Sequence, residues 1–73
     1  MDDIKETLKR YVENKIPTGG FLQSVLENDL FEAVARADRY NIHRIYEICD
    51  YIYNNLPYQC WGDKEKVEKW LKK

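Results

Sequence analysis

The chain has 73 residues, of which 44% are apolar and 34% are charged, and its formal net charge is −1. A chain of this length buries a small core, so we expect a single domain over residues 1–73. The charge balance argues against a dedicated nucleic-acid-binding protein, because such proteins present a basic surface to the phosphate backbone. No apolar segment approaches the roughly 18 residues of a membrane span, and no secretory leader opens the sequence, so a cytoplasmic protein without membrane contact is expected.

Apolar residues at helical spacing predict a first helix over residues 3–14. Asp2 and Asp3 are suited to cap its start, where carboxylates interact favourably with free N–H groups. Its apolar face consists of Ile4, Leu8, Tyr11 and Val12. The helix is expected to end before Ile16, because a residue that precedes proline is driven towards extended geometry.

A second helix is expected over residues 20–27, with Phe21, Leu22, Val25 and Leu26 facing inward. Asn28 and Asp29 then interrupt the apolar pattern. Asp29 resembles a capping residue because Glu32 follows three positions later. The sequence therefore predicts either a third short helix over residues 30–38 or a kink within one longer helix. Its inner side would carry Leu30, Val34 and Ala37, and the small alanines would let a neighbouring helix approach closely.

The strongest helical pattern covers residues 42–56, with Asn41 as the expected N-terminal cap. At about 100° per residue, one arc carries its apolar side chains. These are Ile42, Ile45, Tyr46, Ile48, Cys49, Ile52, Tyr53 and Leu56. Tyr51 falls on the polar face instead, so we expect it to face water, as a lone surface ring or as an anchor in a protein interface.

Asp63 is expected to cap a last helix over residues 64–72, with Val67, Trp70 and Leu71 facing inward. The aromatic side chains of Tyr46, Tyr53, Trp61 and Trp70 are expected to contribute buried area to the core. No β-branched alternation is present. The fold class predicted is therefore all-α, a compact bundle of four to five short helices with the helix over residues 42–56 at its centre.

Residues suited to catalysis or metal binding are sparse. One histidine and two cysteines cannot supply the ligand set of a tetrahedral zinc site, so no metal is expected. Cys49 falls on an apolar arc and Cys60 has no base beside it in the sequence, so both are interpreted as structural. Without a nucleophile and base that converge, the protein is not expected to be an enzyme, and we assign no catalytic residue and no cofactor.

The turn formed by Thr18, Gly19 and Gly20 has two interpretations. Its glycines permit a tight turn and close packing. Alternatively, free backbone N–H groups at the start of the following helix hold a phosphate or carboxylate. In that case Tyr58 or Trp61 would supply a stacking surface, and Arg36 or Arg39 would add a charge-assisted contact. No Walker-type lysine follows the glycines, so nucleotide hydrolysis is not expected.

Several segments together resemble a set of small proteins encoded by bacteriophages and other mobile elements, mostly of unassigned function. The segments are IPTGGFL (residues 16–22), VLENDL (25–30), RAD (36–38), YIYN (51–54) and CWG (60–62), and the resemblance covers about residues 16–71. It implies a phage or mobile-element origin, a bacterial host cytoplasm and an accessory role such as countering host defence. It supplies no catalytic residue.

These observations favour a protein that acts by non-catalytic binding. The expected partner is another protein, either a host factor or a second copy of this chain. The alternative is a small anionic, nucleotide-like ligand held where the Thr18-Gly19-Gly20 turn meets the loop of residues 58–62. A DNA-binding regulator is a third hypothesis. It is weakened because its best recognition helix, over residues 42–56, carries Glu47 and Asp50 beside Arg44.

Overall fold

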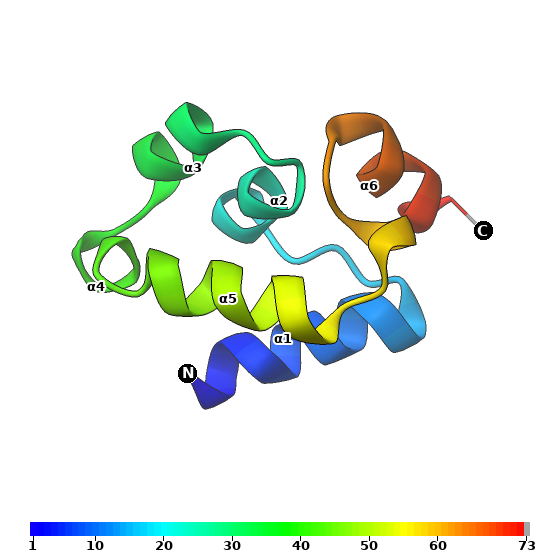
Figure 1. Ribbon diagram of the computed structural model, residues 1–73, viewed down its shortest axis with the longest axis horizontal. Helices are drawn as coiled ribbons and strands as arrows, with labels where there is room; N and C mark the ends of the chain where they lie inside the picture. Colours follow the sequence, from blue (N-terminus) through cyan, green and yellow to red (C-terminus); the bar gives the residue numbers. More distant parts are fainter. Residues whose placement is uncertain (73) are drawn as a thin grey trace.

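The computed structural model describes residues 1–72 as helices joined by short connections (Figure 1). Within these residues it has no strand, so the all-α prediction is confirmed. In this part of the chain the helices are α1 (Asp2–Asn14), α2 (Gly20–Leu26), α3 (Leu30–Arg36), α4 (Arg39–Ile42), α5 (Ile45–Asn55) and α6 (Lys64–Leu71), with a 3₁₀ turn η1 (Tyr58–Cys60). None of the helices described is long and apolar enough to cross a membrane.

The core forms between α1 and α5, which lie beside each other, and α2 and α6, which pack against them (Figure 1). Its buried side chains come from α1, α2, α5, α6 and the η1 region. They are Ile4, Leu8, Tyr11, Leu22, Leu26, Ile48, Ile52, Leu56, Cys60 and Val67. The apolar face predicted for the first helix is confirmed at Ile4, Leu8 and Tyr11, which are 6%, 1% and 1% exposed.

Aspartate side chains cap three of the helices. Asp29 accepts a hydrogen bond from the backbone N–H of Glu32 at 3.2 Å, and Asp63 accepts one from that of Lys66 at 2.8 Å. Both caps were expected from the sequence. Asp38 caps α4 by accepting from the N–H of Asn41 at 2.7 Å, so the prediction that Asn41 itself is the cap is wrong.

The helix predicted over residues 42–56 is interrupted, because α4 ends at Ile42 and α5 begins only at Ile45. Arg44 lies at this break, with its side chain 11% exposed. Its Nη2 donates to Asn41 Oδ1 at 3.1 Å and lies 3.7 Å from Asp3 Oδ2 of α1, while its guanidinium covers the ring of Tyr40 at 4.0 Å. These contacts offset part of the cost of burying the charge, and they accompany the change of chain direction, while Arg44 Nε is buried without a hydrogen-bond partner in the described structure.

The side of α5 that packs into the core is rotated from the predicted arc. Ile48 and Ile52 are 0% and 3% exposed, whereas Tyr46 and Tyr53 are 79% and 64% exposed. The prediction that these two tyrosines lie in the core is therefore wrong. The physical reason is that α1 packs against the flank of α5 that carries Tyr51, which leaves the opposite flank open.

The two tryptophans are half-buried against the core, as expected. Trp61 Nε1 donates to the carbonyl of Leu56 at 3.2 Å, and Trp70 Nε1 donates to that of Tyr11 at 3.0 Å. Lys15 covers the Trp70 ring, with Nζ 3.5 Å from its centroid. The Trp61 hydrogen bond holds the residue after η1 close to the end of α5, and the Trp70 contacts hold α6 against α1.

α2 and α3 are separate helices, because Asn28 between them has a left-handed backbone with φ of 61°. The inward side of α3 is carried by Ala33, which is 1% exposed. The expectation that Leu30 and Val34 face the core is wrong, since they are 63% and 46% exposed. The small side chain of Ala33 allows α3 to lie against α2, as the alanine pattern predicted.

Candidate binding surfaces

An apolar cavity lies between the C-terminal end of α2 and the middle of α5. Its volume is about 230 Å³, and it is lined by Val25, Asn28, Cys49, Ile52, Tyr53 and Trp61. Among the described residues around it none carries a charge, and Asn28 contributes the one amide side chain. An apolar, concave surface of this kind favours the binding of an apolar group.

This cavity continues towards α3 as a narrower hollow of about 60 Å³. The hollow is lined by Val25, Asn28, Asp29, Leu30, Ala33, Ile45 and Cys49. Val25, Asn28 and Cys49 therefore line both parts, and the two parts form one continuous surface. We call it the α3–α5 groove, with a wide end at Trp61 and a narrow end at Ala33.

Aromatic rings form the wall of the wide end. The ring centroid of Trp61 lies 5.9 Å from that of Tyr53 and 5.6 Å from that of Tyr58, in tilted geometries. The loop that carries Trp61 is attached to α2 because Gly62 N–H donates to the carbonyl of Leu26 at 2.7 Å. Gly62 has a φ of +126°, a backbone conformation that a residue with a Cβ rarely adopts, so glycine is needed at this attachment.

α3 presents an exposed apolar side next to the groove. Phe31 is 86% exposed, and Leu30 and Val34 are also largely open to solvent. We call these three side chains the α3 apolar face. Such large apolar side chains gathered on one short helix are unusual for a surface that meets only water, and they are typical of interaction sites. The sequence analysis missed Phe31, although Leu30 and Phe31 are consecutive and cannot both face the core of one helix.

The two cysteines have different surroundings. Cys49 lies in the α3–α5 groove and is accessible, whereas Cys60 is 0% exposed and its Sγ donates to the carbonyl of Pro57 at 3.1 Å. Burial raises the pKa of Cys49 above its ordinary value and raises the pKa of Cys60 to about 11. A raised pKa disfavours the thiolate, which is the form of cysteine that acts as nucleophile and metal ligand.

The predicted turn residues line a different cavity. Gly20 opens α2 beside Arg36, in a space of about 360 Å³. A Cβ on Gly20 would lie 2.8 Å from Arg36 Nη1, so the absence of a side chain permits this close approach. The lining residues are Gly20, Gln23, Ser24, Glu27, Asp29, Glu32, Arg36 and Lys64.

The charges of this cavity do not favour an anion. Glu27, Asp29 and Glu32 face it together with Arg36 and Lys64, so carboxylates outnumber cations. Arg36 Nε also pairs with Glu32 Oε1 at 2.6 Å, which offsets part of its positive charge within α3. An incoming phosphate would lie near the carboxylates of Glu27, Asp29 and Glu32, and like charges at short range repel.

The predicted site residues therefore fall into separate groups. Gly20 and Arg36 meet at one cavity, with Thr18 and Gly19 in the adjoining turn, where Thr18 Oγ1 donates to the carbonyl of Gly19 at 3.3 Å. Tyr58 and Trp61 meet at the wide end of the α3–α5 groove, and neither is among the described residues that line the Gly20 cavity. Arg39 is exposed at the start of α4.

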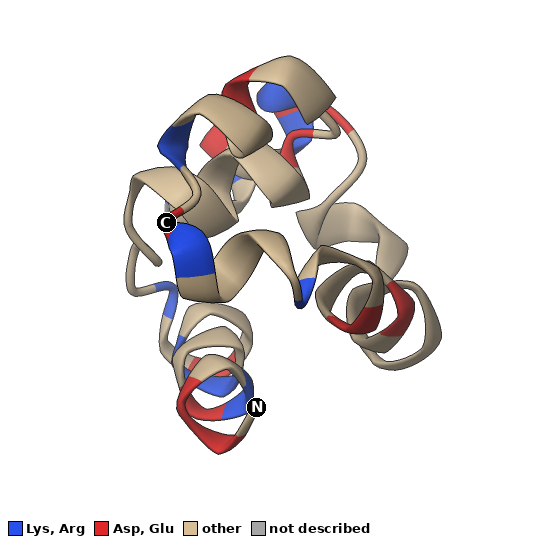
Figure 2. Cartoon of the chain, turned by 90° about the vertical axis from the view of Figure 1, so that its left-hand side faces the viewer, with Lys and Arg blue, Asp and Glu red and all other residues tan. Residues whose placement is uncertain are grey.

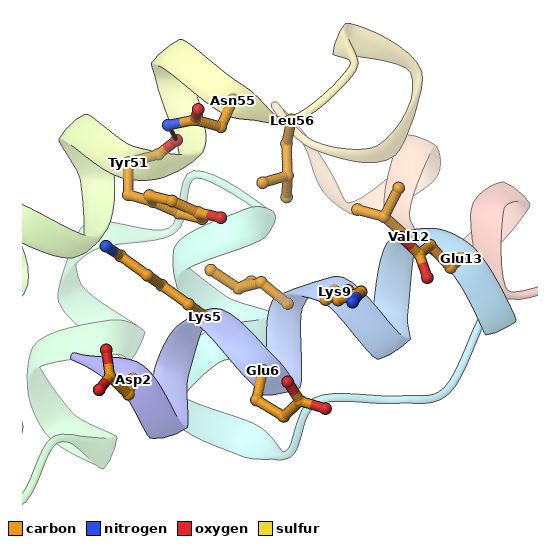
Figure 3. Close-up of a pocket in the computed structure, with 10 residues that line it drawn as sticks. Asp2, Lys5, Glu6, Lys9, Val12, Glu13, Tyr51, Asn55 and Leu56 are labelled. Carbon is orange, nitrogen blue, oxygen red and sulfur yellow. Dashed lines mark hydrogen bonds between the residues drawn. The ribbon is translucent and has the colours of Figure 1, made fainter.

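Tyr51 lies in a third concave surface, a shallow groove of about 510 Å³ between α1 and α5 (Figure 3). Its ring points from α5 towards α1 and is half-buried, with Lys5 Nζ 5.3 Å from the ring centroid. The prediction that Tyr51 faces water is wrong. Leu8, Val12 and Leu56 form the apolar part of the groove lining, while charged side chains of both signs border it. Figure 2 shows these acidic and basic positions interleaved along α1.

Replacing Tyr51 with alanine is expected to lower the free energy of unfolding by about 1–2 kcal/mol, because the ring covers part of the core and contacts Lys5. Tyr46→Ala is the matched control, since Tyr46 lies on the same helix and is 79% exposed. That variant should change stability by less than about 0.5 kcal/mol. Urea titrations followed by circular dichroism would measure both, and equal effects would contradict the orientation of α5.

Within residues 1–72, no group of three or more His, Cys, Asp or Glu side chains is placed to hold a metal ion. Of the three surfaces, the α3–α5 groove alone combines a wide end without charged lining residues with exposed apolar side chains at its border. Comparison with models of known protein families gave no match, and comparisons with curated proteins and with solved structures gave none either.

Proposed function

We propose that this protein acts by non-catalytic binding of another protein molecule in the α3–α5 groove. The observation that carries the proposal is the join between an uncharged apolar cavity and the exposed α3 apolar face. Protein interfaces are built around apolar and aromatic side chains that lose their water on binding, with charged residues depleted from the centre. The rings of Tyr53, Tyr58 and Trp61 are suited to be such anchors.

The biological setting proposed for this binding rests on the sequence resemblance to small phage and mobile-element proteins. An accessory protein of a phage acts on the machinery of a bacterial host, and a counter-defence role requires only that a host factor be occupied. A groove that holds a segment of that factor would be sufficient, without any reaction.

The alternative of a small anionic ligand has less support. It requires the turn at Gly20 and the rings of Tyr58 and Trp61 to face one ligand, whereas they line different cavities. The cavity at Gly20 also presents more carboxylates than cations. The protein-binding proposal needs neither condition.

The test compares two variants that place the same positive charge at different positions along the exposed flank of α5. Tyr53→Lys puts the charge at the wall of the groove, whereas Tyr46→Lys puts it two turns nearer the start of the helix, outside the residues that line the groove. Both tyrosines are exposed, so both variants should fold. Immobilised wild-type protein and Tyr46→Lys should retain the same host proteins from a bacterial lysate, and Tyr53→Lys should retain them at least about tenfold less.

Cys49 provides a second readout, because it lies in the groove and is accessible. A bound partner should slow its alkylation by N-ethylmaleimide, while the buried Cys60 serves as an internal reference that stays unmodified in the folded protein. Equal retention by both lysine variants, together with full reactivity of Cys49 in the captured complex, would refute the groove as the binding surface.

A further inference from the structure

We propose that the wide end of the α3–α5 groove receives one tryptophan or tyrosine side chain of the bound protein. The inserted ring lies among the apolar side chains of the cavity, and its N–H or O–H group pairs with the side-chain amide of Asn28. This inference rests on the proposed function, because it names the chemical group that the partner inserts into the same surface.

The cavity at the wide end has the size of one aromatic side chain. Its volume is about 230 Å³. An apolar cavity of about 150 Å³ is sufficient to bind benzene, so a phenol ring or the larger indole ring can be accommodated at the wide end. The narrow end, with a volume of about 60 Å³, is too small for a second ring. The groove therefore has room for one ring, and that ring lies at the wide end.

The lining of the wide end excludes a charged side chain. The described lining residues are Val25, Asn28, Cys49, Ile52, Tyr53 and Trp61. None of them is an acidic or basic residue. A lysine or arginine inserted among them would lose its water without gaining a carboxylate partner, and an aspartate or glutamate would find no cation. The group that enters the wide end is therefore neutral.

The walls of the wide end favour an aromatic group over an aliphatic one. The rings of Tyr53 and Trp61 are tilted against each other with centroids 5.9 Å apart. An inserted ring can meet them in the offset or edge-to-face arrangements that aromatic pairs adopt, and its edge can contact the sulfur of Cys49. A leucine or isoleucine side chain would bury a similar apolar area but would make none of these additional contacts.

Asn28 selects a ring that carries a hydrogen-bonding group. It lines both ends of the groove, with a left-handed backbone whose N–H donates to the carbonyl of Val25 at 3.0 Å. No hydrogen bond of its side-chain amide is found within residues 1–72. A partner that covers the groove removes water from this amide, and a buried amide without a partner is costly. The indole N–H of tryptophan or the hydroxyl of tyrosine can pair with it, whereas phenylalanine cannot.

Indole, the ring system of the tryptophan side chain, is the probe for this site. In proton–nitrogen correlation spectra, the indole N–H signal of Trp61 and the amide signals of Asn28 should shift and saturate, with a dissociation constant of about 1 mM or tighter. The N–H signal of Trp70 is the internal control, because it donates to the carbonyl of Tyr11 between α6 and α1. Bound indole should also slow the alkylation of Cys49, which lines the same cavity.

Two matched changes isolate the hydrogen bond to Asn28. N-methylindole keeps the rings and lacks the N–H donor, while Asn28→Gly keeps the left-handed backbone and lacks the amide. Either change alone should weaken binding about threefold to tenfold, which is the effect of one hydrogen bond, and Asn28→Gly should bind the two probes nearly equally. Tyr46→Ala alters a residue outside the described groove lining and should bind indole as wild type does.

Displacement connects the probe to the bound protein. Indole at about ten times its dissociation constant should reduce about tenfold the retention of those host proteins that Tyr53→Lys also fails to retain. A Trp61 signal that does not shift up to about 10 mM indole would overturn the proposal of an aromatic occupant. Full retention of the host proteins in the presence of bound indole would overturn it as well.

These failures are distinguishable from failure of the proposed function. If indole does not bind or does not displace, but Tyr53→Lys still loses the host proteins, the groove remains the protein-binding surface and its occupant is not an aromatic side chain. Retention by Tyr53→Lys equal to that of wild type would instead refute the groove as the binding surface and, with it, the occupant.

Discussion

Replacing Leu26 with alanine is expected to lower the free energy of unfolding by about 2–5 kcal/mol. Leu26 is 0% exposed and lies at the end of α2, where its backbone carbonyl also receives the hydrogen bond from Gly62. Alanine would leave a cavity among side chains of α2, α5 and η1 that cannot close without moving the helices. A chain of this length has roughly 4–11 kcal/mol of total stability, so the variant should lose about half of it.

Thermal unfolding monitored by circular dichroism measures this effect, and the melting temperature should fall by roughly 10–30 °C. Leu30→Ala is the matched control, because Leu30 is 63% exposed on the neighbouring helix. In the monomer its melting temperature should change by only a few degrees. A Leu26→Ala protein as stable as Leu30→Ala would show that α2 is not part of the core.

Replacing Tyr11 with phenylalanine is expected to cost about 1–3 kcal/mol, although the two residues differ only by a hydroxyl group. Tyr11 is 1% exposed, and its hydroxyl donates to the carbonyl of Cys60 at 2.7 Å across 49 positions of sequence. Without the hydroxyl this carbonyl remains buried and loses a partner. Burial raises the pKa of Tyr11 above its ordinary value, which keeps the hydroxyl protonated as a donor.

Urea denaturation at neutral pH would measure the loss for Tyr11→Phe. Tyr58→Phe serves as the control, because Tyr58 is 65% exposed and no hydrogen bond of its hydroxyl is found in the described structure. A stability of Tyr11→Phe equal to that of wild type would mean that water or another donor replaces the hydroxyl at Cys60. Hydrogen exchange of the amides around η1 should meanwhile become faster, because this bond holds the turn against α1.

The three concave surfaces described above illustrate why cavity size alone does not identify a binding site. The largest, between α1 and α5, is shallow and bordered by charges of both signs from α1. The cavity at Gly20 contains an internal ion pair, since Arg36 already contacts Glu32. The α3–α5 groove is smaller, but its lining is apolar apart from Asn28 and Asp29 and its border is apolar, and this favours the exclusion of water by a partner.

The sequence predicted correctly those helix ends and faces that depend on contacts between residues close together in the chain. The caps at Asp29 and Asp63 were found because a capping side chain binds a backbone group only three residues away. The end of α1 followed from Pro17, and its buried face followed from apolar spacing. Trp61, which lines the wide end of the α3–α5 groove, was also selected from the sequence as a candidate binding residue, as an aromatic residue in a loop without charge.

The errors arose where distant contacts decide the outcome. The break before α5 coincides with a contact between Arg44 and Asp3, which are 41 positions apart in the chain, a pairing that helical spacing cannot reveal. Likewise, the exposure of Phe31 depends on which side of α3 meets α2, and the seven-residue length of that helix leaves little pattern to decide it.

The amino-acid sequence by itself determined that this protein is helical, where most of its helices begin and end, and that its chemistry is poor in nucleophiles and ligands. These properties follow from backbone preferences and from hydrogen bonds within a few residues. Only the tertiary structure decided that Tyr51 turns inward, that Tyr46 and Tyr53 turn outward, and that the α3–α5 groove exists. A helix with apolar residues on most of its circumference can bury several different flanks, and the helices packed against it select one.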